Sequence, residues 1–142
     1  MDKAMLLDQV EKKVLNHLDW NFEVSNDDSD NIIIETPFMN HLDEPINLYI
    51  IFKHQQLYLS DDGETLLFWQ NHSKKEFNWL YDQIQSKAES FHLNHFYINR
   101  SLTIQCFFDF QSHSEQIYNF MQLLIQADQL QQLYDLHHIS LR

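Results

Sequence analysis

The spacing of apolar residues changes along the chain, and each change marks an element that we expect. Residues 2–18 carry an apolar residue every three or four positions, with charged residues between them. This spacing predicts an amphipathic helix at the start of the chain. The six residues from Ser25 to Asp30 are all polar and favour neither helix nor strand, so they predict a solvated turn.

Beyond this turn, apolar and polar residues alternate with a period of two. The alternation covers residues 31–36, 46–53 and 56–60, and it predicts three consecutive strands. Only two residues link the second strand to the third, which indicates an antiparallel hairpin. We therefore interpret the three strands as a meander.

Three later segments have the form of a capping box, in which a polar side chain caps the first turn of a helix and an acidic residue three positions on completes the cap. They are residues 61–64, 73–76 and 112–115. After them we expect a helix that is broken near Asn71, a longer helix, and a last helix that runs to about Leu136. This last helix is apolar on more than one face, which is typical of a buried helix.

Between the last two helices, residues 95–99 and 101–108 alternate again and predict a hairpin with its corner at Asn99 and Arg100. The order is helix, three strands, broken helix, two strands, helix. We expect a single α+β domain over residues 1–142, with an antiparallel sheet of about five strands.

The charge balance excludes several classes of ligand. The chain has 21 acidic and 9 basic residues among 142, a formal net charge of −12. Because nucleic-acid affinity comes mainly from Lys and Arg that displace counterions from phosphates, we expect no direct binding of DNA or RNA. We expect no membrane binding either, since an anionic surface repels this charge and no apolar run reaches the roughly 18–20 residues that span a bilayer.

The composition favours a folded cytoplasmic protein. Hydrophobic residues make up 44% of the chain and aromatic residues 14%, more than a disordered acidic chain carries. Cys106 is the single cysteine, so no internal disulfide can form and the cytoplasm is the expected compartment. The N-terminal segment mixes charged and apolar residues and lacks the continuous apolar stretch of a signal peptide.

Three segments together resemble a bacterial family of domains of unknown function: Glu35-Thr36-Pro37-Phe38, the loop Met39-Asn40-His41-Leu42-Asp43 before an alternating strand, and the turn Leu59-Ser60-Asp61-Asp62-Gly63-Glu64-Thr65. Outside these segments the resemblance to the family is weaker, and it covers most of the chain from about Asp19 onward. It implies a bacterial, often prophage, cytoplasmic setting, and it implies no established activity and no catalytic residues. The element order, size and charge are also similar to those of type III secretion chaperones, which are acidic dimers that hold a partner chain; this is an analogy of fold.

Acidic residues gather in two loops that a meander brings to one edge of the sheet. The end of the third strand lies beside the loop between the first two, so we expect His41, Asp43 and Glu44 near the turn after Ser60. Hard oxygen ligands in such a place suit Mg²⁺ or Ca²⁺, although capping and turn chemistry explain the same residues more simply. The candidate partner-binding residues are Asp43, Glu44, Asp61, Asp62 and Glu64.

Other chemistry has little support in the sequence. Nine scattered histidines and one cysteine do not form a zinc-binding pattern, and a single glycine cannot build a phosphate-binding loop. Cys106 lies on the apolar face of its strand and is predicted to be a core residue. We therefore predict no catalytic residue, no metal site and no cofactor, and enzymatic activity is the less favoured interpretation.

The aromatic residues point to an extra interface. Tyr49 and Ile51 lie on the face opposite Ile50, and Phe107 lies opposite Cys106. A sheet that is apolar on both faces needs cover on both. Helices on both sides, a second copy of the chain or a different partner protein would each provide it.

These observations together favour a non-catalytic, acidic protein-binding module. Its negative surface would steer it to a basic protein, and an inhibitor that imitates the charge of DNA is one form of this hypothesis. The alternatives are a chaperone-like homodimer that holds a partner chain and a divalent-metal hydrolase that uses Asp43, Asp61, Asp62 and Glu64.

Overall fold

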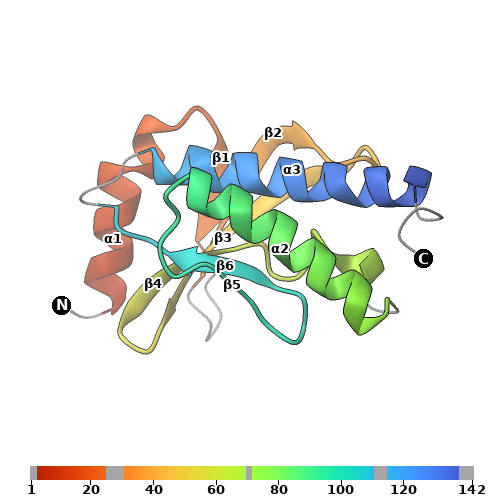
Figure 1. The fold of residues 1–142 in the computed structure, drawn as a ribbon. Helices are drawn as coiled ribbons and strands as arrows, with labels where there is room; N and C mark the ends of the chain where they lie inside the picture. Colours follow the sequence, from red (N-terminus) through yellow and green to blue (C-terminus); the bar gives the residue numbers. More distant parts are fainter. Residues whose placement is uncertain (1–2, 25–30, 70–71, 111–114, 138–142) are drawn as a thin grey trace.

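A computed structural model describes residues 3–24, 31–69, 72–110 and 115–137 of the chain (Figure 1). The structure is α+β, as the two periodicities predict. In chain order, its elements are α1 (Lys3–Lys13), η1 (Leu15–His17), β1 (Asn21–Val24), β2 (Ile32–Met39), β3 (Pro45–Lys53), β4 (Gln56–Ser60), η2 (Leu67–Trp69), α2 (Lys74–Ser90), β5 (Tyr97–Ile98), β6 (Ile104–Phe107) and α3 (Gln116–His137).

The sheet has six strands in the order β1-β2-β3-β4-β6-β5, and every neighbouring pair is antiparallel. β2, β3 and β4 form the predicted meander. β1 was not predicted, because its four residues are too few to show an alternation. β2 continues past Pro37, where an irregular register between Glu35 and Met39 accommodates a residue without an N–H donor.

The connection between β5 and β6 differs from the predicted tight corner. β5 has only two residues, and a five-residue loop from Asn99 to Thr103 follows it. The side-chain oxygen of Asn99 accepts hydrogen bonds from the N–H groups of Ser101, at 2.9 Å, and Thr103, at 3.0 Å. This Asx-type turn replaces the two-residue hairpin, because the Asn99 side chain and two backbone hydrogen bonds between Asn99 and residues 102 and 103 hold the loop together.

The helix predictions have mixed outcomes. The capping box at Ser73 is present, with Ser73 and Glu76 bonded to each other's backbone N–H groups at the start of α2. The first helix is shorter than expected and ends at Lys13, where a 3₁₀ turn follows. Residues 61–64 form a turn and do not cap a helix. The expected break near Asn71 and residues 112–114 of the third capping box, predicted at 112–115, lie outside the described residues.

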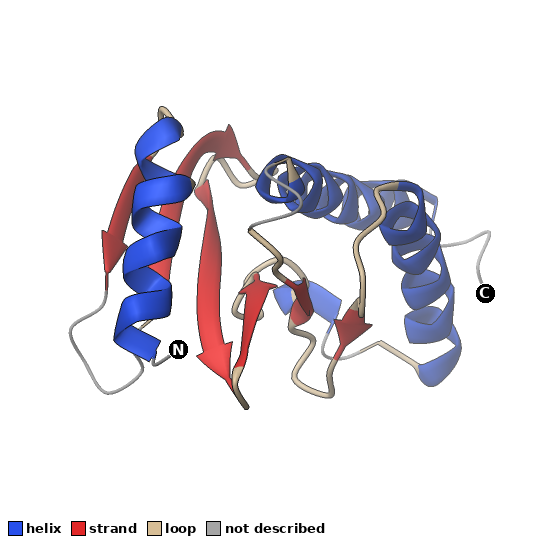
Figure 2. Cartoon of the chain, turned by 90° about the vertical axis from the view of Figure 1, so that its left-hand side faces the viewer, coloured by secondary structure: helices blue, strands red, loops and turns tan. Residues whose placement is uncertain are grey.

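One hydrophobic cluster joins all three helices to the inner face of the sheet. Ile34, Leu48 and Leu59 are fully buried there, and α3 is buried on several sides along its length, as its composition predicts. α2 and α3 pack together over the sheet, while α1 runs alongside the strands on the β1–β3 side (Figures 1 and 2). Cys106 belongs to this core, and its burial raises the pKa of the thiol to about 12. In the described part of the chain, no helix combines the length and the hydropathy needed to cross a membrane.

Candidate functional site

A cavity of about 140 Å³ lies where the loop after β2, the turn after β4 and helix α3 meet. Three acidic residues line it: Glu44 from the loop, Glu64 from the turn and Asp128 from α3. Apolar walls complete it, and none of its lining residues in the described part of the chain is Lys or Arg. The cavity therefore has a negative character.

The β2–β3 loop is attached to α3 by one side chain. Asp128 accepts a hydrogen bond from the backbone N–H of His41 at 2.9 Å, and its second oxygen lies 2.6 Å from Nδ1 of the same histidine. Both side chains are mostly buried. Within the loop, the Asn40 side chain accepts hydrogen bonds from the N–H groups of Leu42 and Glu44. The two contacts between His41 and Asp128, which are 87 positions apart in the sequence, thus hold the β2–β3 loop against α3.

Glu64 is held from the sheet. The hydroxyl of Tyr49, on β3, donates a hydrogen bond of 2.5 Å to Oε1 of Glu64. Partial burial of the ring, this hydrogen bond and the negative charges of Glu64 and Asp62 all raise the pKa of Tyr49. The Tyr49 hydroxyl therefore stays protonated over the physiological pH range and can donate this hydrogen bond to Glu64 throughout it.

Asp61 has a structural role, contrary to its selection as a partner-binding residue. It is fully buried, and its carboxylate accepts hydrogen bonds from the backbone N–H groups of Gly63 (2.9 Å), Thr65 (3.0 Å) and Ile104 (2.8 Å). Burial raises its pKa, and the three hydrogen bonds oppose that rise. The sequence did not predict this role, because the Asp-Asp-Gly-Glu motif is also typical of a helix cap. The hydrogen bond from the N–H of Ile104, on the distant strand β6, could not be predicted from the motif.

The other predicted residues are divided between the cavity and its surroundings. His41, Glu44 and Glu64 come together as expected. Asp43 and Asp62 are exposed in turns with positive φ angles of 58° and 54° and do not line the cavity, a conformation that Asp tolerates better than most residues. In the described ranges, no group of three or more His, Cys, Asp or Glu side chains is arranged to hold a metal ion.

The outer face of the sheet, next to this cavity, carries a row of apolar side chains. The strand registers place Ile33 beside Tyr49, Ile51 beside Tyr58, and Tyr58 beside Phe107. We call these five residues the open face. Each is only partly buried, and each lies outside the hydrophobic cluster of the described residues. The prediction that the sheet is apolar on both faces is thus confirmed, and no element in the described part of the chain packs over the outer face.

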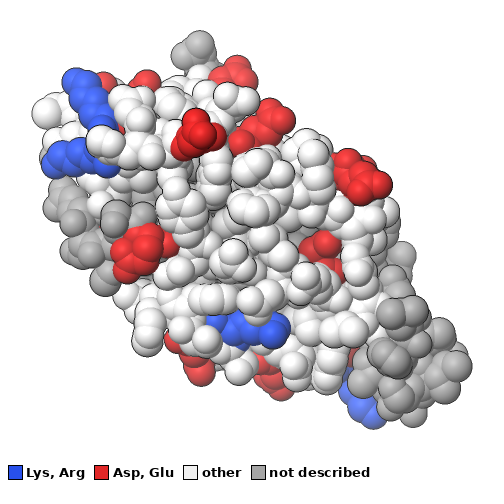
Figure 3. Space-filling view, turned by 90° about the horizontal axis from the view of Figure 1, so that it is seen from above, with Lys and Arg blue, Asp and Glu red and all other residues white. Residues whose placement is uncertain are grey.

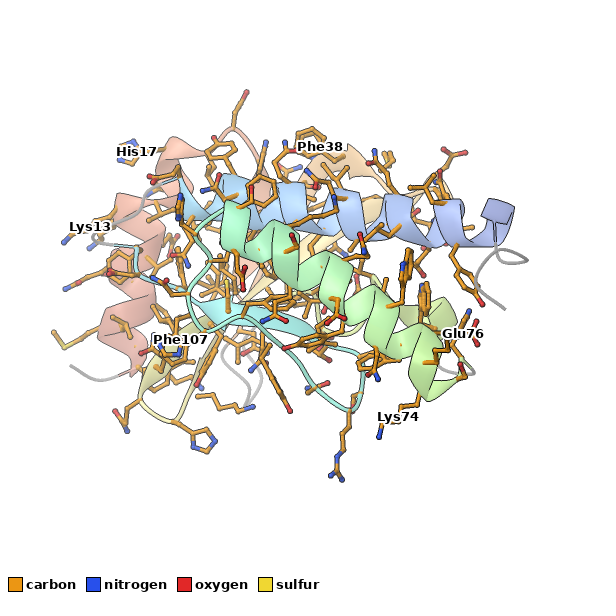
Figure 4. All side chains as sticks on the ribbon, viewed as in Figure 1. Lys13, His17, Phe38, Lys74, Glu76 and Phe107 are labelled. Carbon is orange, nitrogen blue, oxygen red and sulfur yellow. The ribbon has the colours of Figure 1, made fainter. Side chains whose placement is uncertain are left out.

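The open face is well ordered by ring contacts. The rings of Tyr58 and Phe107 meet edge to face at 5.3 Å, and His95 stacks on Phe107 at 4.0 Å. Figure 4 shows Phe107 on the lower side of the molecule, away from α3. These contacts hold the aromatic surface in one arrangement.

The fringe of the open face is mostly acidic. Glu23 lies beside Ile33 across the β1–β2 pair, and Glu35 lies beside Asn47, which also lines the acidic cavity. Glu64 adjoins the face through Tyr49. Lys53 extends the same face at the end of β3. The open face and the cavity therefore form one continuous surface with an apolar centre and an excess of negative charge at its margins.

The sequence did not point to two residues of this surface. Asp128 stands in a helix rich in Gln and apolar residues, and that contrast was the signal that could have identified it. Tyr49 was recognised as an outer-face residue, but its bond to Glu64 depends on the fold of the turn after β4.

Comparisons with protein-family models, with curated proteins and with solved structures find no match to this chain. The two resemblances noted in the sequence stay predictions.

Proposed function

We propose that this chain is a protein-binding module and that its partner is a basic protein, which contacts the open face and the adjoining acidic cavity. The single observation that carries the proposal is the row of apolar side chains across β2, β3, β4 and β6, which no element of the described chain covers. Exposed apolar surface with a polar rim is typical of protein-protein contact sites.

The charge of the surface supports a basic partner. Acidic residues lie along the β1 and β2 side of the open face and line the cavity. In the described residues, Lys53 is the basic residue that we find on that face. A partner rich in Lys and Arg would approach faster through this field and would find complementary charges at the rim. A second copy of the same chain would instead bring like charges together, so we favour a different protein.

On the face seen in Figure 3, the distribution of acids does not favour the more specific hypothesis of a DNA-charge mimic. Seen from above, acidic side chains lie singly on a largely uncharged surface (Figure 3). A mimic of DNA needs closely and regularly spaced negative charges, since a duplex carries one charge per about 1.7 Å of its axis. The run of acids at residues 27–30 lies outside the described residues.

Affinity capture from the native cell's lysate, with matched variants, tests the proposal. We expect the wild-type chain to retain one or a few basic proteins, and retention to fall as salt rises because the rim contacts are screened. The variant Tyr58→Ser/Phe107→Ser should lose them through the loss of apolar contact, and Glu44→Gln/Glu64→Gln should weaken them about tenfold through the loss of charge-assisted contacts.

Glu89→Gln, on the exposed side of α2, is the matched control and should retain the same proteins. Circular dichroism of each variant checks that the fold is kept. Equal capture by all variants, or capture that salt does not affect, would contradict the proposal. Sedimentation of the free protein separates the chaperone-like alternative: a dimer that the Tyr58→Ser/Phe107→Ser variant converts to a monomer would assign the open face to a second copy.

A further inference from the structure

A second cavity, of about 480 Å³, lies between the start of α2 and the loop from Asn99 to Thr103. Its volume is within the roughly 300–1,000 Å³ that is usual for small-molecule sites. The loop leads into β6 and lies beside Gly63 in the turn after β4, but the cavity shares no lining residue with the open face or with the acidic cavity. An inference about it stands apart from the proposed function.

The walls of this cavity are aromatic and rigid. Trp69 is almost fully buried and stacks on His72 at 4.2 Å, and Tyr134 meets both rings, at 4.8 and 5.0 Å. Phe77 and the buried Leu102 complete the apolar lining. These rings and Trp79 cover most of the Trp69 indole, so a flat apolar group would meet the small exposed part of Trp69 together with the half-buried ring of Phe77.

The rim of the cavity is basic, in contrast to the chain as a whole. Lys74 from α2 and Arg100 from the loop line it, and none of its lining residues in the described part of the chain is acidic. The neighbouring Glu76 is directed to the backbone N–H of Ser73, and Figure 4 shows Lys74 and Glu76 pointing in different directions from the first turn of α2. In a protein of net charge −12, two bases without an acid mark a local preference for an anion.

We propose that the cavity binds a small aromatic anion, with the ring of the ligand against Trp69 and Phe77 and its anionic group between Lys74 and Arg100. Ser73 and Ser101, which also line the cavity, offer hydroxyl groups to the same anion. The ring and the charge are both required, because the apolar wall and the basic rim each supply only part of the contact.

Titrations of the ¹⁵N-labelled chain, followed by NMR, test this inference. Phenyl phosphate and benzoate are the aromatic anions; inorganic phosphate lacks the ring, benzyl alcohol lacks the charge and benzylamine reverses it. We expect saturable shifts of the Trp69 indole and of Arg100 and Ser101 with the aromatic anions, and at least tenfold weaker binding of the three controls. The stronger of the two anions identifies the kind of anionic group, phosphate or carboxylate.

Two exposed substitutions test the assignment of the rim without disturbing the core. Lys74→Gln/Arg100→Gln should weaken binding of the better anion about tenfold or more, since each side chain contributes a charge-assisted contact. Lys87→Gln, in the last turn of α2, should leave binding unchanged. Equal shifts by benzyl alcohol, no saturable shift by either anion, or unchanged binding in the double variant would each overturn the inference.

Discussion

The carboxylate of Asp61 joins two strands that are neighbours in the sheet but distant in the chain. Asp61 follows the last residue of β4, and its carboxylate accepts a hydrogen bond from the N–H of Ile104, the first residue of β6, 43 positions later. Gly63 makes the turn possible, because its φ of +77° suits glycine and the space beside it is narrow, with Oγ1 of Thr103 only 3.3 Å from where a Cβ would lie. The Asp-Asp-Gly element is therefore a structural junction.

Asp61→Ala should lower the free energy of unfolding by about 2–4 kcal/mol, because three backbone N–H groups lose their acceptor in a buried place. Urea denaturation measures it. Asp61→Asn keeps one acceptor oxygen and should recover part of the loss. Asp62→Asn, next in the chain but exposed, is the control and should change stability by less than about 0.5 kcal/mol. A stable Asp61→Ala protein would show that the junction is not needed.

Tyr49 gives a second prediction at the residue scale, from its raised pKa. Because the folded state favours the neutral phenol, the contribution of this group to stability is fully present below pH 10, the ordinary pKa of tyrosine, and is lost as pH rises through the higher folded value. The stability advantage of wild type over Tyr49→Phe should therefore shrink above pH 10. Urea denaturation of both proteins between pH 8 and pH 11 tests this.

Glu64→Gln provides the matched control for that experiment. The substitution keeps an acceptor for the Tyr49 hydroxyl but removes the charge that disfavours its ionisation. The difference between wild type and Tyr49→Phe should then depend less steeply on pH in the Glu64→Gln background. An identical pH dependence in both backgrounds would rule out the Tyr49–Glu64 pair as its cause.

At the scale of elements, long alternating segments were predictable and short ones were not. β3 spans nine residues with a clear period of two, and its hairpin with β4 follows from a two-residue link. β1 and β5 have four and two residues, and such strands exist because a neighbour pairs with them, which is information that local sequence does not hold. The same holds for the five-residue loop that Asn99 organises.

The candidate site was partly predictable, because part of it is built by long alternating strands. The meander topology brings His41, Glu44 and Glu64 together, and topology followed from three alternating segments. The contribution of α3 did not follow, because Asp128 stands out in a Gln-rich, apolar helix but its local sequence does not indicate which loop it faces. Likewise, the burial of Asp61 depends on β6 packing beside β4.

At the scale of the whole molecule, the net charge of −12 should weaken the folded state at low ionic strength. Folding brings the negative charges closer together, so their repulsion destabilises the folded state, and dissolved salt screens this repulsion. We expect the urea midpoint to rise as NaCl is raised from about 10 mM to about 300 mM, a range over which the screening length falls from roughly 30 Å to below 10 Å. Choline chloride should act similarly if screening is the cause. A midpoint that falls or stays constant would contradict this expectation.

The order of the sheet also limits how another chain can join it. Its two margins are β1, with four residues, and β5, with two. An added strand would find few unpaired backbone groups at either margin, and short edge strands are one way in which proteins avoid edge-to-edge association. A partner of this protein is therefore expected to recognise side chains and not a strand edge. Its affinity should depend on the side chains of the open face and should change little when residues of β1 or β5 are substituted.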